Sequence, residues 1–347
     1  MPAKIGRYLV IERLGSGATG VVYAAYDPEL DRRVAIKCLH PGIRGPESRE
    51  RLRREAQALA RLTYPHVVTV HDVGTWDADG SRRLFIAMTC VAGQNLGAWL
   101  RDGRREWRAV LDLLLQAGRG LAAAHGAGLL HRDFKPDNIL VEHGDRAQVA
   151  DFGLACFLDS GESGPQQIPM ASLIERAVDL TGPDRLVGTP AYMAPEILKG
   201  QVDERSDQFS YCATLYEALY GVRPHSGRSL LQLFNRKLEG ALVQPPENRG
   251  VPKWIHEAMT RGLEPDPEDR WPSMDALLAE LTRDRRRRRI SMLGAAALAA
   301  AALAAGVGMT AAVRTPATVC ETSPTPWRGV WDDGRRGDLR RAFLDAG

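Results

Sequence analysis

A glycine-rich turn between two β-prone runs places the strongest constraint on how this chain can fold. The turn spans residues 15–20 (GSGATG) and lies between the runs at residues 8–11 and 21–26. Glycines at this spacing let a backbone approach phosphate groups closely and direct amide N–H groups toward them. The same spacing suits a dinucleotide-binding turn, but that turn opens a helix. Because a β-prone run follows here, we predict a strand–turn–strand lid over a nucleotide.

A lysine ends the next apolar run. Residues 34–37 read Val-Ala-Ile-Lys, and residues 49–62 have the periodicity of an amphipathic helix that carries Glu55. A lone lysine at the end of a strand is usually a solvated edge charge. A pair between Lys37 and Glu55 would instead hold the ammonium over the α- and β-phosphates of a nucleotide.

Two acidic motifs follow further along the chain. Residues 131–138 read HRDFKPDN, and Asp151-Phe152-Gly153 comes one short strand later. Together they bring two carboxylates, an amide and an ammonium into a compact stretch. Phosphoryl transfer from a nucleotide–magnesium complex needs this set, because a carboxylate orients a hydroxyl, oxygen atoms hold the metal and a cation lies near the phosphates.

The pattern changes from strand to helix after residue 93. A strand-rich first part followed by a helix-rich second part predicts an α+β fold of two lobes, with a cleft between them as the ligand site. We place the N-lobe at about residues 8–91 and the C-lobe at about residues 92–283. Further strands are predicted at residues 33–37, 67–73 and 84–90, and helices at residues 96–100, 110–125, 206–220, 230–239, 253–263 and 274–282.

The order of these motifs resembles the eukaryotic-type (Hanks-type) serine/threonine protein kinase family, in its bacterial transmembrane form. Ala-Pro-Glu at residues 194–196 extends the resemblance, which covers residues 8–281. It implies the bilobal protein kinase fold and an enzyme that transfers the γ-phosphate of ATP to protein Ser/Thr hydroxyls. The implied cofactors are ATP and Mg²⁺, with Mn²⁺ as a substitute, and Lys135 is typical of the serine/threonine branch.

The resemblance also implies roles for individual residues. Asp133 would orient the acceptor hydroxyl, and Lys135 would steady the γ-phosphate. Asn138 and Asp151 would hold the metal ion. The implied catalytic set is Asp133, Lys135, Lys37 and Glu55.

The nucleotide would lie under the glycine turn and against the segment that joins the lobes. In that segment Thr89 and Cys90 stand where the family usually has an acidic and an aromatic residue, a change that backbone contacts to adenine tolerate. The residues expected to contact the nucleotide or its metal are Leu14, Gly15, Ser16, Gly17, Ala18, Thr19, Gly20, Val22, Ala35, Lys37, Met88, Cys90, Asn138 and Asp151.

Four further expectations concern the structure around the site. Phe152 would pack inside, and Thr189 would lie near Asp133 and shape the site for the acceptor residue. Glu196 would pair with Arg270 to anchor the helical lobe. Asp207 would hold the backbone of the loop that carries Asp133.

A membrane-tethered pseudokinase scaffold, which binds nucleotide and signals by docking, is the alternative function. Such proteins typically lack equivalents of Lys37, Asp133 or Asp151, whereas this chain has all three. Its other phosphoryl-transfer residues are also in place, which favours an active enzyme.

Two features point to regulation. Arg132 precedes Asp133, where the family often binds a phosphorylated residue, and Thr181 is the predicted phosphorylation site. Residues 156–187 form a longer stretch than the family usually has. It could be a docking or autoinhibitory element, or a disordered insertion that the fold tolerates, and its Gly, Ser and Pro content favours the second reading.

Residues 290–313 are almost entirely Ala, Leu, Gly, Val and Met and carry no charge. As a helix they would extend about 36 Å, enough to cross a hydrocarbon core of about 30 Å. The arginines at 285–289, in a basic juxtamembrane segment at 284–289, place that end in the cytoplasm by the positive-inside rule. The alternative is an alanine-rich helix that is soluble or lies on a surface.

We therefore expect a single-pass protein of the inner or plasma membrane. Its kinase domain, residues 1–283, would be cytoplasmic, and residues 314–347 would form an extracytoplasmic tail that we expect to be truncated. The net charge of +3 is small, so nucleic acid is not an expected partner. The expected partners are protein substrates, the lipid bilayer and, as the family suggests, a second copy in a homodimer.

Overall fold

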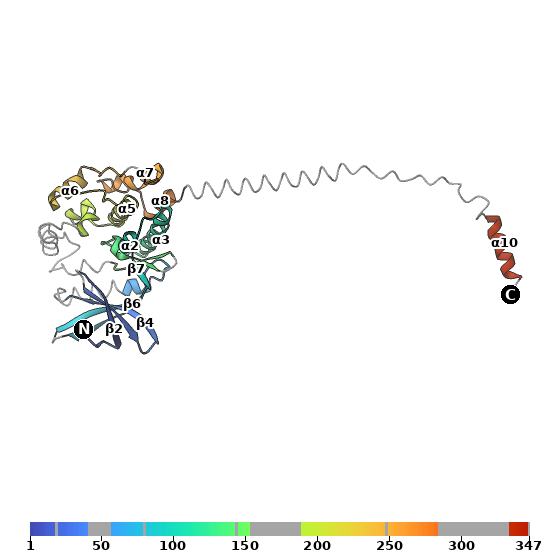
Figure 1. Cartoon of the computed structure of the whole chain (residues 1–347), viewed down its shortest axis with the longest axis horizontal. Helices are drawn as coiled ribbons and strands as arrows, with labels where there is room; N and C mark the ends of the chain where they lie inside the picture. Colours follow the sequence, from blue (N-terminus) through green and yellow to red (C-terminus); the bar gives the residue numbers. More distant parts are fainter. Residues whose placement is uncertain are drawn as a thin grey trace. The chain divides into compact units, whose positions relative to one another are not determined.

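The computed structural model describes residues 1–17, 20–40, 57–78, 81–142, 145–152, 189–246, 249–283 and 333–345. The chain divides into two compact units, Met1–Asp284 and Arg285–Gly347, and each is taken by itself. Every described strand belongs to the first unit, which also contains the candidate site (Figure 1).

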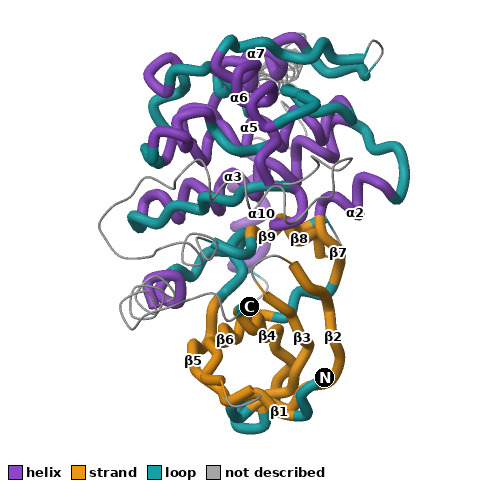
Figure 2. Tube along the Cα trace, turned by 90° about the vertical axis from the view of Figure 1, so that its left-hand side faces the viewer, coloured by secondary structure: helices purple, strands orange, loops and turns teal. Residues whose placement is uncertain are grey.

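A six-stranded antiparallel sheet forms the first lobe of this unit (Figure 2). Its spatial order is β1-β2-β3-β4-β6-β5. The strands are rich in Val, Ile and Tyr, residues that suit a pleated and half-buried surface. They are β1 (Lys4–Ile5), β2 (Tyr8–Gly17), β3 (Gly20–Asp27), β4 (Arg32–Leu39), β5 (Val70–Ala78) and β6 (Ser81–Thr89).

Strand β4 lies inside the sheet and is buried on both faces. Val34 and Ile36 belong to one apolar cluster, whereas Ala35 and Leu39 belong to another. Because side chains alternate along a strand, Lys37 lies on the same face as Ala35 and Leu39. The position of a single lysine relative to the cleft is therefore fixed by the register of this strand.

The strand expected over residues 67–73 begins later, at Val70. Val67 instead forms an isolated parallel bridge with Val149, and the Val68 N–H donates to the Val149 carbonyl at 2.9 Å. The apolar run is thus divided between two partners. Its first residues tie the six-stranded sheet to the second sheet, and the rest joins β6.

A three-stranded antiparallel sheet brings the two acidic motifs together. Ile139 pairs with Val149, and the Ala150 N–H donates to the Asn138 carbonyl at 2.9 Å. Since the two ends of this hairpin are adjacent, the loop before it and the loop after it share one end of the sheet. The strands, in spatial order, are β7 (Gly93–Asn95), β8 (Ile139–Glu142) and β9 (Arg146–Val149).

Helices make up the rest of the second lobe (Figure 1), and α5 is its most buried helix. The carboxylate of Asp203 accepts the N–H groups of Arg205 and Ser206 at its start, and Gly221 ends it with a φ of 72°. The helices are α2 (Leu96–Arg101), α3 (Trp107–Gly126), α5 (Glu204–Tyr220), α6 (Leu230–Leu238), α7 (Lys253–Arg261) and α8 (Met274–Leu281), with short 3-10 turns η1 (Pro136–Asn138), η3 (Thr189–Ala191), η4 (Pro195–Lys199) and η5 (Pro267–Asp269).

The predicted two-lobed α+β arrangement is confirmed, and the six helices predicted after residue 93 are found to within about one turn at each end. Of the helix expected at residues 49–62, residues 57–61 are helical, and the part that carries Glu55 lies outside the described residues.

In the second unit, the described helix is α10 (Asp333–Leu344), which has no buried residue. Among the helices that the structure describes, none is both long and apolar enough to cross a membrane. The span expected at residues 290–313 and the arginines at 285–289 lie outside the described residues.

Candidate active site

The glycine turn connects two antiparallel strands, as predicted, and does not open a helix. Gly17 pairs with Gly20 across the turn, while Ala18 and Thr19 lie outside the described residues. A Cβ atom on Gly20 would lie 2.1 Å from the Cys38 carbonyl oxygen, so only glycine fits there. A Cβ on Gly15 or Gly17 would meet nothing within 4 Å, which leaves open space beside the turn.

Four of the residues predicted to contact the nucleotide share one apolar cluster. Ala35 and Met88 are buried in it, and Val22 and Cys90 pack against it partly exposed. Leu140 of β8 also packs against this cluster. Leu140 is not among the residues predicted from the sequence, although the apolar run Ile139-Leu140-Val141 could have indicated a buried strand there. The cluster therefore has walls from both lobes, as an adenine site needs.

Lys37 forms an ion pair with Asp151 across the two lobes. The Lys37 Nζ lies 2.8 Å from Asp151 Oδ2, and the lysine side chain is only 3% exposed. Asp151 has a φ of 62°, in the left-handed region. Glu55, the predicted partner of Lys37, lies outside the described residues.

The loop before β8 holds one carboxylate oxygen of Asp133 and leaves the other free. Asp133 Oδ2 accepts from Lys135 Nζ at 2.7 Å and from Asn138 Nδ2 at 3.1 Å. The same Asn138 nitrogen donates to the Asp133 carbonyl at 2.7 Å. In the described part of the chain, Asp133 Oδ1 is buried and has no hydrogen-bond partner. An acceptor atom without a donor is suited to receive a substrate hydroxyl.

His131 connects the two acidic motifs. Its Nε2–H donates to the Ala150 carbonyl at 3.0 Å, while Nδ1 accepts the Asp133 N–H at 3.3 Å. This pattern requires the neutral ring. Burial lowers the pKa of His131, and the nearby carboxylates of Asp207 and Asp133 oppose that shift only in part. The ring therefore stays uncharged and fixes the backbone on both sides of the site.

Asp207 holds the same loop from below, as predicted. Its two oxygens accept the N–H groups of His131 and Arg132, each at 2.7 Å. It also accepts from His125 Nε2 at 2.9 Å and is 1% exposed. Because α5 carries Asp207 into the core, the geometry of the Asp133 loop depends on the most buried helix of the lobe.

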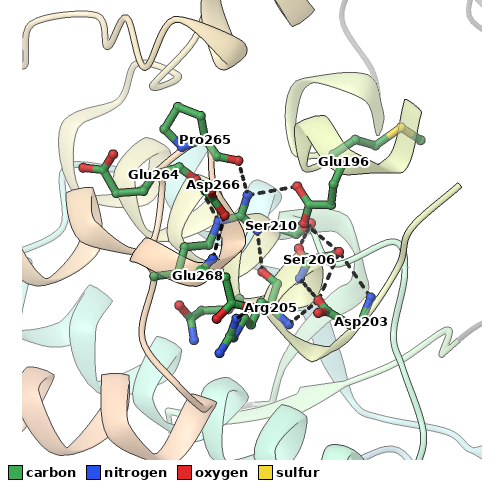
Figure 3. Close-up of polar contacts among 12 residues, drawn as sticks. Glu196, Asp203, Arg205, Ser206, Ser210, Glu264, Pro265, Asp266 and Glu268 are labelled. Carbon is green, nitrogen blue, oxygen red and sulfur yellow. Dashed lines mark hydrogen bonds and ion pairs between the residues drawn. The ribbon is translucent and has the colours of Figure 1, made fainter. Parts of the chain in front are cut away.

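The predicted pair between Glu196 and Arg270 is confirmed. Figure 3 shows the polar contacts around Glu196 and Ser206. Two guanidinium nitrogens donate to the two Glu196 oxygens at 2.8 and 2.9 Å, and Ser206 Oγ donates to Glu196 at 2.7 Å. Arg270 also donates to the carbonyls of Glu264, Pro265 and Arg205. Such a bidentate, fully hydrogen-bonded pair fixes the segment after Thr189 on the helical lobe.

Phe152 packs inside, as expected, and is 4% exposed. Its ring centroid lies 4.6 Å from that of His131. With Asp151, Met88 and Leu59 it borders a small apolar cavity of about 20 Å³. The side chain of Phe152 thus occupies the interior while the neighbouring Asp151 reaches Lys37.

The residues present fit a divalent ion of the magnesium type. Asn138 and Asp151 provide an amide and a carboxylate next to the two adjacent ends of the β8–β9 hairpin. Hard cations prefer such oxygen ligands. The Asn138 nitrogen is committed to Asp133, so its oxygen is the atom that could face the ion. Thr181 and the stretch at 156–187 lie outside the described residues, and only the backbone of Thr189 is described.

Comparison with known proteins supports the geometry. The family model described as the protein kinase domain matches residues 8–292. A probable serine/threonine-protein kinase of Clostridium acetobutylicum is 34% identical over 280 residues, covering 80% of this chain and 39% of that protein. The serine/threonine-protein kinase pkn3 of Myxococcus xanthus is 36% identical over 299 residues, covering 82% and 51%. This chain therefore spans only about two fifths to one half of the length of these relatives.

Among solved structures, the PknI kinase domain of Mycobacterium tuberculosis is similar to this chain with a TM-score of 0.59 and 28% sequence identity. The match covers 81% of this chain and 97% of that domain. The similarity thus extends over most of this chain and nearly all of that domain.

Proposed function

The chain belongs to the protein kinase domain family, and from this premise we propose that it transfers the γ-phosphate of ATP to serine or threonine hydroxyls of protein substrates. Lys135 and the names of the two curated relatives support the serine/threonine branch. Those relatives are much longer than this chain, so the proposal also covers the activity and substrates of the whole protein.

The observation that carries the proposal is the difference between the two oxygens of Asp133. Lys135 and Asn138 hold Oδ2, whereas Oδ1 has no partner among the described residues. A substrate hydroxyl that donates to Oδ1 would be oriented for attack on the γ-phosphorus. Asp133 would take the hydroxyl proton as the new O–P bond forms and the bond from the γ-phosphorus to the bridging oxygen of ADP breaks.

Two lysines would supply positive charge to different phosphates of the nucleotide. Lys37, fixed by Asp151, would contact the α- and β-phosphates, and Lys135, fixed by Asp133, would contact the γ-phosphate. Asn138 and Asp151 would hold Mg²⁺ or Mn²⁺, which would neutralise the negative charge of the phosphates.

Replacing Asp133 with Asn tests the proposal directly. The full chain would be incubated with labelled ATP, magnesium and dephosphorylated casein as a generic acceptor. We expect the wild type to label the acceptor and D133N to lose on the order of 10²- to 10⁴-fold in rate with nucleotide binding retained. A wild type that binds no adenine nucleotide in the presence of magnesium would contradict the proposal. The scaffold alternative requires instead that D133N keep its signalling output.

We also propose that residues 290–313 anchor the protein in the membrane, with the kinase domain in the cytoplasm and residues 314–347 outside. The uncharged sequence and the arginines before it support this topology. Protease added to intact spheroplasts should cut the tail and spare the kinase domain. Recovery of the full chain in the soluble fraction would contradict it.

Regulation by phosphorylation of Thr181 and by formation of a homodimer stays a prediction. Arg132 has the chemistry to bind a phosphorylated Thr181 through paired N–H groups. Mass spectrometry of active protein that shows Thr181 unmodified would remove that site. Sedimentation of the full chain in detergent would decide whether two copies associate.

A further inference from the structure

Lys237 of α6 is a lysine with no exposed surface, an unusual position for this residue type. Its Nζ donates to the Pro190 carbonyl at 2.7 Å and to the Met193 carbonyl at 2.6 Å. Within the described part of the chain no carboxylate forms an ion pair with it. Two backbone oxygens therefore hold a buried ammonium.

Aromatic rings complete its surroundings. Nζ lies 4.9 Å from the ring centroid of Phe234 and 5.6 Å from that of Phe209. These distances suit attraction between a cation and the negative face of a ring. The lysine charge is thus stabilised by carbonyls and ring faces that belong to three different segments.

The two carbonyls belong to the segment that follows Thr189. The side chain of Tyr192, which lies between them in the chain, donates its hydroxyl to Glu217 of α5. Glu196, three residues beyond Met193, is fixed by Arg270. The contacts of Tyr192 and Glu196 are made by their side chains. Lys237 instead donates to backbone carbonyls of residues 190–193.

We propose that Lys237 is a positioning residue for the protein acceptor, holding residues 190–193 in the conformation that receives the acceptor segment. The inference rests on the proposed kinase function and on the expectation that Thr189, which directly precedes this segment, shapes the acceptor site beside Asp133. It extends that function by making acceptor binding, and not nucleotide binding, depend on α6.

The charge of Lys237 is expected to matter, because hydrogen bonds from an ionised donor are roughly twice as strong as neutral ones. Burial lowers the pKa of Lys237 to about 7, and Glu196 opposes the shift. The nearby ring of His225 does not change charge over this range, because burial lowers its pKa to about 3. The other charged side chains close by are Glu196 and Arg270, which pair with each other. Acceptor binding should therefore weaken as the pH rises through about 7.

The test measures KM for casein, KM for ATP and kcat on the full chain, comparing wild type with K237M, K237R and R236M. Arg236 is the matched control, since it is a neighbouring basic residue of the same helix that is exposed. We expect K237M, which removes both hydrogen bonds, to raise the casein KM at least tenfold, with the ATP KM within about twofold of wild type. R236M should resemble wild type. K237R, which stays charged, should keep a casein KM below that of K237M at both pH 6.5 and 8.5.

A casein KM of K237M equal to that of wild type would overturn the inference, and so would equal rises in both KM values. If K237M does not fold, the wild-type pH profile decides. The casein KM should rise between pH 6.5 and 8.5 while the ATP KM stays level, and a level casein KM would overturn the inference. A wild type that labels no acceptor at all would contradict the kinase function itself, which separates the two failures.

Discussion

Asp207 accepts the backbone N–H of Arg132 at 2.7 Å across 75 positions of the chain, and Arg132 there has a φ of 63°. A residue other than glycine in the left-handed region costs on the order of 1–3 kcal/mol. The buried carboxylate offsets this cost and thereby fixes the residue next to Asp133. A strained backbone at the catalytic position is thus maintained from the core of the helical lobe.

Replacing Asp207 with Asn should abolish most activity while the fold survives in weakened form. The amide nitrogen cannot accept an N–H, so one backbone donor of the loop would be left unpaired in the interior. We expect a loss of about 3 kcal/mol in the free energy of unfolding and at least a hundredfold loss in kcat. Urea denaturation and casein phosphorylation would measure the two effects.

Asp203→Asn is the control for that experiment. Asp203 caps the same helix by accepting the N–H groups of Arg205 and Ser206, and Asn caps helices about as well as Asp. Stability and kcat of D203N should stay close to wild type. A D203N protein as inactive as D207N would show that the effect comes from α5 in general and not from the loop contact.

The glycine turn should respond differently at its two ends. A Cβ on Gly20 would lie 2.1 Å from the Cys38 carbonyl oxygen, so G20A should lose about 1–3 kcal/mol in stability. Gly17 has open space around its Cβ position, so G17A should keep its melting temperature. If phosphates approach this backbone, G17A should raise the ATP KM. An unchanged ATP KM in G17A would argue against that approach.

The buried pair of Glu196 and Arg270 should be costly to break from one side. E196A leaves a guanidinium buried without its counter-charge, and we expect a loss of about 3–5 kcal/mol in the free energy of unfolding. The ion pair between Arg205 and Glu268 is the matched control, because Glu268 is 79% exposed. E268A should change stability by less than about 1 kcal/mol. Equal losses in the two variants, measured by urea denaturation, would contradict this account.

Lys237 should make stability depend on pH. Its pKa is about 7 in the folded protein against 10.5 for an ordinary lysine. Between those values the unfolded chain binds a proton that the folded chain does not, so stability rises with pH at up to about 1.4 kcal/mol per unit. The free energy of unfolding of wild type should therefore rise relative to that of K237M from pH 7 to pH 9. A constant difference over that range would contradict the shifted pKa.

The sequence could predict the two lobes and some contacts around the site, such as that of Asp207 with the loop before β8 and that of Glu196 with Arg270, because ordered motifs and local periodicity carry that information. It could not predict where the strand at Val70 begins, since Val67 pairs with Val149, far along the chain. The Lys37–Asp151 pair was missed for the same reason, as it depends on how the lobes meet.

Lys237 shows another limit. A lysine near the end of an amphipathic helix is normally exposed. Nothing in the local pattern indicates that its ammonium donates to the carbonyls of Pro190 and Met193. Only the packing of α6 against the segment after Thr189 reveals its role.

The hairpin of β8 and β9 has a consequence for motion. Asn138 and Ala150 are joined at its open end, so the groups that would act on the phosphate and its metal belong to one rigid element. Lys37 belongs to the other sheet. A hinge motion between the lobes would therefore change the distance from the Lys37 ammonium to the acidic groups, while the distances among the acidic groups stayed constant. Control exerted through such a motion would affect nucleotide binding before it affected proton transfer.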